Sequence, residues 1–286
     1  MFGRRPTPAK TDEQLLLMRR AGLLVGQTLE LLSSRVEAGL TTLDLDALAE
    51  EFIRSHGAVP NFQLVPGYAH TLCTSVNDEV VHGIPGHRVL QDGDLLSIDC
   101  GAQLDGWNGD AARSLIVGPV GVLDQHGPER SEDLELVTAT EDALWAGIVA
   151  LEVGERLYAV GEAVEASVQG ASARRGRDYG IIEEYVGHGI GRSMHEDPQI
   201  PNYAVRDRGP TVRSGFTGAI EPMVTLGSAQ TRVLDDDWTV VTADGSRAAH
   251  WEHSVAVTDN GLCVLTAVDG GRSRLEASGA AYLPLD

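Results

Sequence analysis

The chain has 286 residues, of which 42 are acidic and 22 basic, giving a formal net charge of −20. Hydrophobic residues make up 42% of it and charged residues 22%, the composition of a globular protein with a substantial core. The excess of acid excludes general nucleic-acid binding, because a phosphate backbone repels such a surface. No apolar run approaches the ~20 residues that cross a bilayer. The three cysteines are widely spaced and predict no disulfide framework, so we expect a cytoplasmic protein with no membrane partner.

The first part of the chain predicts a basic arm followed by two helices. Residues 1–10 contain two prolines and adjacent arginines, which predict a short extended arm. Thr11 and Gln14 match a capping box, so a helix should begin there and continue to about residue 37. A second helix is expected over residues 41–57, with threonine at its start and glycine at its end.

The rest of the chain alternates between strand-rich and helical segments. Residues 59–117 are rich in glycine, proline and short apolar runs, which predict strands joined by turns. The clearest expected elements are strands at 95–98, 114–117, 217–226 and 250–258, and helices at 129–151 and 155–173. Residues 268–286 show little periodicity and predict a C-terminal tail.

The expected order is therefore two helices, strands, two helices and strands. This order indicates an α+β domain built from two similar halves, although no repeat is visible in the residues themselves. No linker divides the chain, so we expect a single domain over residues 11–267.

Four acidic residues interrupt or end the expected apolar strands. Asp99 closes the run Leu-Leu-Ser-Ile-Asp, and Asp110 lies at the start of the next strand, so a hairpin would bring both carboxylates together at one end. Glu221 ends another apolar strand, and Glu252 falls on a later one. Each such acid alone is most often a turn or surface residue, but buried together they would cost several kcal/mol per charge. Divalent cations would neutralise such a cluster, and one histidine, His188 or His195, would add a nitrogen ligand.

Four segments in order carry a resemblance to a known family. They are Val-Asn-Asp-Glu-Val-Val-His-Gly-Ile-Pro at 76–85, Gly-His-Gly-Ile-Gly at 187–191, Ile-Glu-Pro-Met at 220–223 and Glu-His at 252–253. Together they resemble type I methionine aminopeptidase, of peptidase family M24, over nearly all of residues 11–266. The resemblance implies the pita-bread (creatinase/aminopeptidase) α+β fold, with two pseudo-symmetric halves around a dinuclear metal site.

The resemblance also implies the metal ligands. Asp110 and Glu252 match the bridging pair, Asp99 the ligand of one ion, and His188 and Glu221 the ligands of the other. The family uses cobalt, manganese, iron or zinc, so two divalent ions of one of these kinds are expected.

The implied reaction is removal of the N-terminal methionine from nascent proteins and peptides. A hydroxide bridging the two ions would attack the first peptide carbonyl, while Glu221 moves a proton to the leaving amine. His195 would donate a hydrogen bond to the carbonyl oxygen, and His82 would orient the substrate at the scissile nitrogen. The free α-amino group would bind a metal, which restricts cleavage to a chain terminus.

The methionine side chain needs an apolar pocket. By position, Tyr68, Cys73, Met194 and Trp238 resemble the residues that line it, and Phe62 and Val65 are further candidates. Plain core packing is the alternative interpretation of these six residues. The family prefers a small residue after methionine.

Three positions depart from the family's pattern. His250 stands where glutamine is usual, Ala219 where threonine is common, and Ala111 where threonine is frequent. Each change is expected to remove a hydrogen bond beside a ligand and so to weaken metal binding.

Two other functions remain open. An X-Pro aminopeptidase shares the fold and ligands but usually carries a long N-terminal domain, and a non-catalytic peptide-binding homologue usually loses ligands. A monomer is expected, and the basic arm, with Arg4, Arg5 and Lys10, is a candidate contact to the ribosome.

Overall fold

The computed structural model of the protein describes residues 9–123 and 131–285. Of the expected basic arm, residues 1–8 lie outside this described part. The helices are α1 (Asp12–Ser33), α2 (Thr42–Ser55), α3 (Glu132–Val149), α4 (Ala159–Arg175) and α5 (Arg272–Ser278), with a 3-10 turn at Phe62–Leu64. Strands before α3 are β1 (Val59–Pro60), β2 (Leu72–Val76), β3 (Glu79–Val81), β4 (Leu95–Leu104) and β5 (Trp107–Ile116). Later strands are β6 (Gly180–Ile181), β7 (Gly187–Gly189), β8 (Glu196–Ile200), β9 (Phe216–Ile220), β10 (Met223–Thr225), β11 (Thr231–Val233), β12 (Val240–Thr242), β13 (Ala248–His250), β14 (His253–Thr258) and β15 (Gly261–Val264).

Two antiparallel sheets form the centre of the fold. In the first, β4 lies between β1 and β2 and pairs in addition with β5. The second has the strand order β15-β14-β9-β7-β8. Two three-stranded sheets, β13-β10-β6 and β11-β12-β3, complete the arrangement, so that β3 from the first half joins strands of the second.

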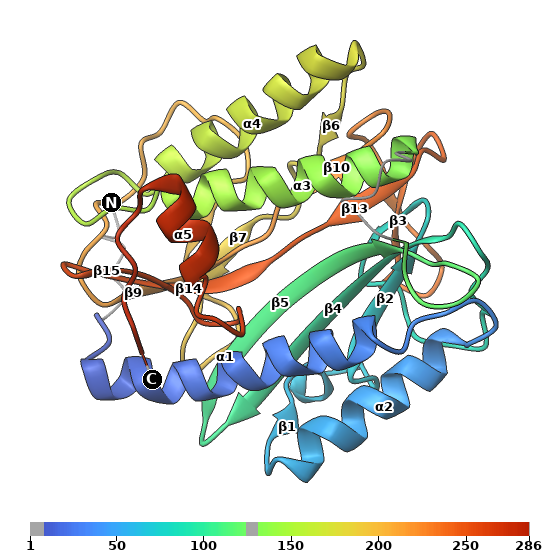
Figure 1. Ribbon diagram of the computed structural model, residues 1–286, viewed down its shortest axis with the longest axis horizontal. Coiled ribbons are helices and arrows are strands. Elements are labelled where there is room, and N and C mark those ends of the chain that lie inside the picture. Colours follow the sequence, from blue (N-terminus) through green and yellow to red (C-terminus); the bar gives the residue numbers. More distant parts are fainter. Residues whose placement is uncertain (1–8, 124–130, 286) are drawn as a thin grey trace.

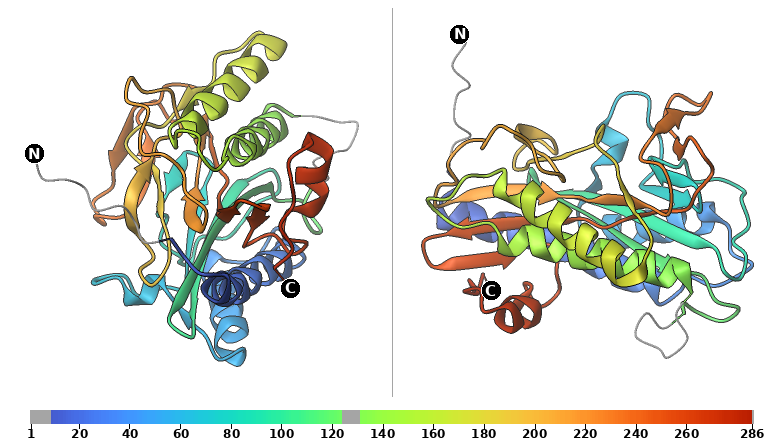
Figure 2. Two further views of the ribbon diagram at one scale, coloured as in Figure 1. Left: turned by 90° about the vertical axis from the view of Figure 1, so that its left-hand side faces the viewer. Right: turned by 90° about the horizontal axis from the view of Figure 1, so that it is seen from above.

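Each helix pair covers its own set of strands (Figure 1). Leucines and valines of α1 and α2 form one buried core with β2, β4 and β5. The helices α3 and α4, which lie side by side (Figure 2), form a second core with β9, β10, β13 and β14. Both cores bury the apolar faces of amphipathic elements, which is the main stabilising term in such layers. The expected α+β fold of two similar halves is confirmed.

Helix starts agree with the sequence better than helix ends do. Thr11 and Thr41 both form complete capping boxes. The first helix was expected to reach residue 37 but ends at Ser33, and the chain leaves the helix where the amides of Ala38 and Gly39 pair with the carbonyls of Gly118 and Leu90. The fourth helix begins at Ala159 rather than residue 155, because backbone groups of residues 154–157 pair with residues 210–212 instead.

The strand predictions found the right regions but the wrong lengths. The runs at 95–98 and 114–117 are the ends of β4 and β5, each ten residues long. The expected strand 217–226 is two strands separated at Glu221-Pro222, where proline offers no amide hydrogen to a ladder. Glu252 was expected on a strand but lies between β13 and β14.

The C-terminal segment contains a helix that the sequence analysis missed. Helix α5 is short, with glycine in the left-handed conformation at both ends, so its seven residues give little periodicity. Leu275 of α5 and Leu285 beyond it are both buried. Among the described residues, none of the helices is both long and apolar enough to span a membrane.

Candidate metal centre and substrate pocket

All five predicted metal ligands meet at one place in the structure. Three overlapping groups of side chains hold their ligand atoms within 4.8 Å of one another among the described residues. The groups are Asp99-Asp110-Glu252, His188-Glu221-Glu252 and Asp110-His188-His195. Asp110, His188 and Glu252 each belong to two of these groups, so the groups form one continuous cluster.

The predicted ligands come from separate strands and strand ends that the fold brings together. Asp99 of β4 and Asp110 of β5 lie on the same face of the long hairpin, where Gly101 pairs with Asp110. They were expected at one end of the hairpin but sit in its middle, since the strands continue past them. Residues opposite them are small, glycine or alanine, which leaves room above the sheet.

The other three ligands belong to the second half. His188 lies on β7 and pairs with Ala219 of β9. Glu221 follows the end of β9, and its carboxylate is 3.5 Å from His188 Nε2. Glu252 enters the cluster from the turn between β13 and β14, where it is almost completely buried.

Electrostatics of the cluster favour a bound cation. Burial raises the pKa of Asp99 to about 7, and burial together with neighbouring carboxylates raises the pKa of Asp110, Glu221 and Glu252. Asp99 Oδ1 and Asp110 Oδ1 are buried and accept no hydrogen bond from the described residues. Acids in this condition are costly unless positive charge neutralises them, so the residues present fit divalent metal ions.

Three histidines surround the cluster. Burial lowers the pKa of His82 and of His188 to about 4, and partial burial lowers the pKa of His195, so all three are neutral near pH 7. The rings of His188 and His195 meet edge to face at 4.3 Å. His82 has a φ of +61°, an uncommon conformation for a residue other than glycine, and its ring lies against that of Tyr185.

A narrow apolar cavity opens beside the acids. Its volume is about 150 Å³, well below the roughly 300–1,000 Å³ of sites for drug-sized ligands, which suits one side chain. All six predicted pocket residues line it, together with the carboxylates and histidines: Phe62, Val65, Tyr68, Cys73, Met194 and Trp238. Burial raises the pKa of the Cys73 thiol well above its usual value, so Cys73 acts as an uncharged wall.

The two halves are joined beside the ligands by a short seam between β5 and the 250–254 segment. The hydroxyl of Ser254 both accepts from the amide of Asp110 (3.0 Å) and donates to its carbonyl (2.7 Å). Two residues along, Ala112 and Glu252 exchange backbone hydrogen bonds of 3.3 and 2.9 Å. The hydroxyl of Ser114 then bonds both backbone groups of His250. The seam therefore fixes the backbones of Asp110 and Glu252 relative to each other.

The three residues that depart from the family's pattern, Ala111, Ala219 and His250, lie in different surroundings. Ala111 packs into the core under α1, on the face opposite to Asp110, so a hydroxyl there would not reach the Asp110 carboxylate; this expectation was wrong. His250 is buried, with Nε2 4.0 Å from Glu252 Oε2 and without a hydrogen-bond partner among the described residues. Ala219 lies directly across from His188.

Sequence reasoning missed several residues around the pocket. Val81 also lines the cavity, Ile84 packs on its wall, and Tyr185 supports His82. Their position beside recognised motifs could have indicated them, since Val81 and Ile84 flank His82 within the 76–85 segment.

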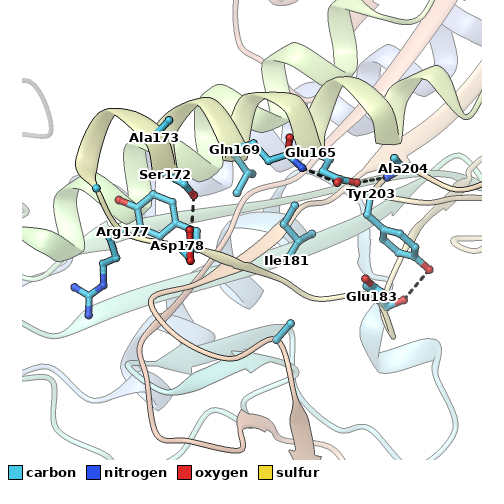
Figure 3. A pocket seen from close by; sticks show the side chains of 14 residues that line it. Glu165, Gln169, Ser172, Ala173, Arg177, Asp178, Ile181, Glu183, Tyr203 and Ala204 are labelled. Atoms are coloured by element: carbon cyan, nitrogen blue, oxygen red, sulfur yellow. Dashed lines mark hydrogen bonds between the residues drawn. The ribbon is translucent and has the colours of Figure 1, made fainter.

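A wider hollow of about 720 Å³ lies between α4 and β6 (Figure 3). Two of its polar side chains already have partners: Glu165 accepts from the Ala204 amide and from Gln169, and Tyr203 donates to the Glu183 carbonyl. It contains none of the metal-binding groups found in the described residues, so the narrow cavity is the candidate active site.

The chain is similar to known proteins along nearly its whole length. The sequence model of metallopeptidase family M24 matches residues 16–259. Methionine aminopeptidase 1 of Mycobacterium tuberculosis is 49% identical over 265 residues, which cover 92% of this chain and 96% of that protein. The crystal structure of methionine aminopeptidase from Thermotoga maritima superposes with a TM-score of 0.83 at 38% identity, covering 91% of this chain and 99% of that one.

A more distant likeness concerns the fold alone. An X-Pro aminopeptidase from Thermotoga maritima has a TM-score of 0.64 at 20% identity, and the match covers 91% of this chain but 62% of that enzyme. Together with the ligand cluster and the pocket, the closer similarities identify the family: the chain belongs to metallopeptidase family M24 and, within it, to the methionine aminopeptidases.

Proposed function

We propose that the narrow cavity is the active site of a metal-dependent aminopeptidase that releases N-terminal methionine from polypeptides with a small second residue. The carrying observation is the junction of five ligand side chains with an apolar pocket sized for one side chain. Family membership supports the same activity.

The ligands would hold two divalent ions, cobalt, manganese, iron or zinc. Asp99 would contact one ion, His188 and Glu221 the other, and Asp110 and Glu252 both. Ions bound there supply positive charge that makes water more acidic and polarises a peptide carbonyl. The two three-residue groups that share Glu252 support this division of the ligands.

The protein's own groups then handle protons and position the substrate. Glu221, with its pKa raised by burial, is suited to take up a proton and pass it to the leaving amine. Neutral His195 donates a hydrogen bond to the carbonyl oxygen as negative charge develops there. His82 orients the substrate at the scissile nitrogen, while Tyr68, Cys73, Met194 and Trp238 enclose the methionine side chain.

The test compares three peptides after metal reconstitution. Chelator-treated protein is reloaded with manganese or cobalt, and metal content is measured after dialysis. We expect about two ions per chain, methionine release from Met-Ala-Ser, much slower release from Met-Leu-Ser, and no cleavage of an Ala-Pro peptide. No release from Met-Ala-Ser by loaded protein refutes the proposal, and cleavage of Ala-Pro instead identifies an X-Pro aminopeptidase. A metal content near zero identifies a non-catalytic homologue.

A matched pair of variants tests the ligand assignment. Asp99→Asn removes a ligand and should lower kcat/KM at least about 100-fold. Asp105→Asn makes the same change in the turn of the same hairpin, where the carboxylate forms an exposed ion pair with Arg20, and should change activity less than about twofold. Equal activity of the two variants would contradict the assignment.

The expected surroundings of the enzyme complete the proposal. It acts as a monomer in the cytoplasm on nascent chains, with residues 11–267 as the catalytic domain. Contact of the 1–10 arm with the ribosome is tested by salt-sensitive co-sedimentation, which should be lost on deleting the arm; no binding of the intact protein at low salt refutes the contact.

A further inference from the structure

Lys10 is the only lysine among the 22 basic residues of the chain, all others being arginine. Its side chain is 8% exposed, and its Nζ lies 2.9 Å from Glu196 Oε2. By contrast, the nearby ion pair of Arg20 with Asp105 is 59% and 56% exposed. Water screens an exposed pair strongly and a buried one weakly, so the Lys10–Glu196 pair is the stronger constraint on its two segments.

Lys10 is closely surrounded by Gly191, Gly215 and Glu196, which together form what we call its socket. Its amide donates to the Gly215 carbonyl at 2.8 Å, and a Cβ at Gly215 would lie 2.4 Å from the Lys10 carbonyl oxygen. A Cβ at Gly191 would lie 2.8 Å from both Cε and Nζ of Lys10. Glycine at positions 191 and 215 therefore leaves room for the ammonium group and the backbone of Lys10.

Glu196 connects this socket to the active site. It follows His195 directly, begins β8, and pairs across the sheet with Gly189, next to His188. While Oε2 binds Lys10, Oε1 accepts from the Ser193 amide at 3.2 Å. The carboxylate thus ties the 191–196 loop, which carries the exposed His195, to the residue that precedes the cap of α1.

We propose that Lys10, acting through Glu196, is a positioning residue that holds His195 at the mouth of the active site. This role rests on the proposed function, because His195 needs a fixed place only if it serves a substrate there. A hydrogen bond to developing charge depends steeply on placement, so a loosened loop slows turnover more than it weakens substrate binding.

The test uses Lys10→Met, Glu196→Gln and the double variant, with Arg20→Met as the control for loss of an exposed pair. We expect kcat on Met-Ala-Ser to fall about tenfold in each single variant, with KM within about twofold of wild type. The double variant should be no slower than either single one, because both remove the same link. Arg20→Met should match wild type.

Hydrogen exchange provides a readout that needs no turnover. The Ser193 amide should exchange faster in Lys10→Met and Glu196→Gln than in wild type or Arg20→Met, measured where thermal unfolding shows all four proteins folded. Unchanged exchange at Ser193, unchanged kcat, or additive losses in the double variant would overturn the proposal. If wild-type protein releases no methionine, the proposed function fails while the exchange result still decides whether the link restrains the loop.

Discussion

Replacing Ser254 with alanine removes one hydroxyl and should destabilise the whole protein. That hydroxyl is the partner of both the amide and the carbonyl of Asp110, and Ser254 is fully buried. Alanine fills nearly the same space, so packing changes little. The change therefore isolates the hydrogen bonds of the seam.

The magnitude follows from what is left unpaired. A buried backbone group without a partner costs about 1–3 kcal/mol, and Ser254→Ala leaves two such groups on Asp110. We expect the free energy of unfolding to fall by about 2–4 kcal/mol. Ser278→Ala is the control, because the Ser278 hydroxyl donates to a single helical carbonyl near the surface, and its loss should cost no more than about 0.5 kcal/mol.

Urea unfolding of the metal-free proteins in chelator, followed by circular dichroism, measures both values. Repeating the measurement with manganese should show a smaller metal-induced gain in stability for Ser254→Ala, because Asp110 is a predicted ligand. A loss of unfolding free energy below about 1 kcal/mol, no larger than that measured for Ser278→Ala, would refute the inference that the Ser254 hydroxyl stabilises the protein by this amount.

Three further changes test other parts of the structure. Gly109→Ala puts a methyl group 2.7 Å from the Gly22 Cα and should cost about 1–3 kcal/mol by overpacking, seen as a lower urea midpoint. Asp46→Asn weakens the buried cap of the Thr71 and Leu72 amides, and should cost about 1–3 kcal/mol in the same assay. Asp99 has a pKa raised to about 7 in the folded metal-free protein, so its charge opposes folding as pH rises from about 4 through 7. Between pH 5 and 8, metal-free Asp99→Asn should therefore gain stability relative to wild type; a constant difference would contradict the raised pKa.

The sequence located the acidic cluster because the signal of each acid is local. Asp99 and Asp110 each interrupt an apolar run, a signal that depends on a few neighbouring residues. The same residues made the predicted strands too short. Charged and glycine positions in the middle of β4 and β5 break the apolar pattern that marks a strand. Their location in mid-strand becomes visible only once both faces of the sheet are placed.

Long-range polar contacts were beyond sequence reasoning. Ser114 and Ser254 are ordinary strand residues until the two halves meet, and no periodicity distinguishes a serine that bonds a distant backbone from one that faces water. The same holds for Lys10, whose partner lies 186 residues away. Side-chain pairs of this kind depend on the final packing rather than on local propensity.

The seam also determines the order in which the parts of the site can assemble during synthesis of the chain. The hairpin of β4 and β5 is local, with Ser97 and Ser114 only 17 residues apart, and can form early. Ser254 is 144 residues beyond Asp110, so the second half of the ligand set arrives only when most of the chain has been synthesised. Until then only Asp99 and Asp110 lie together, on the hairpin, and the growing chain does not yet bring Glu221 and Glu252 against them. A chain stopped short of residue 250 should therefore fold its first hairpin and yet hold no metal.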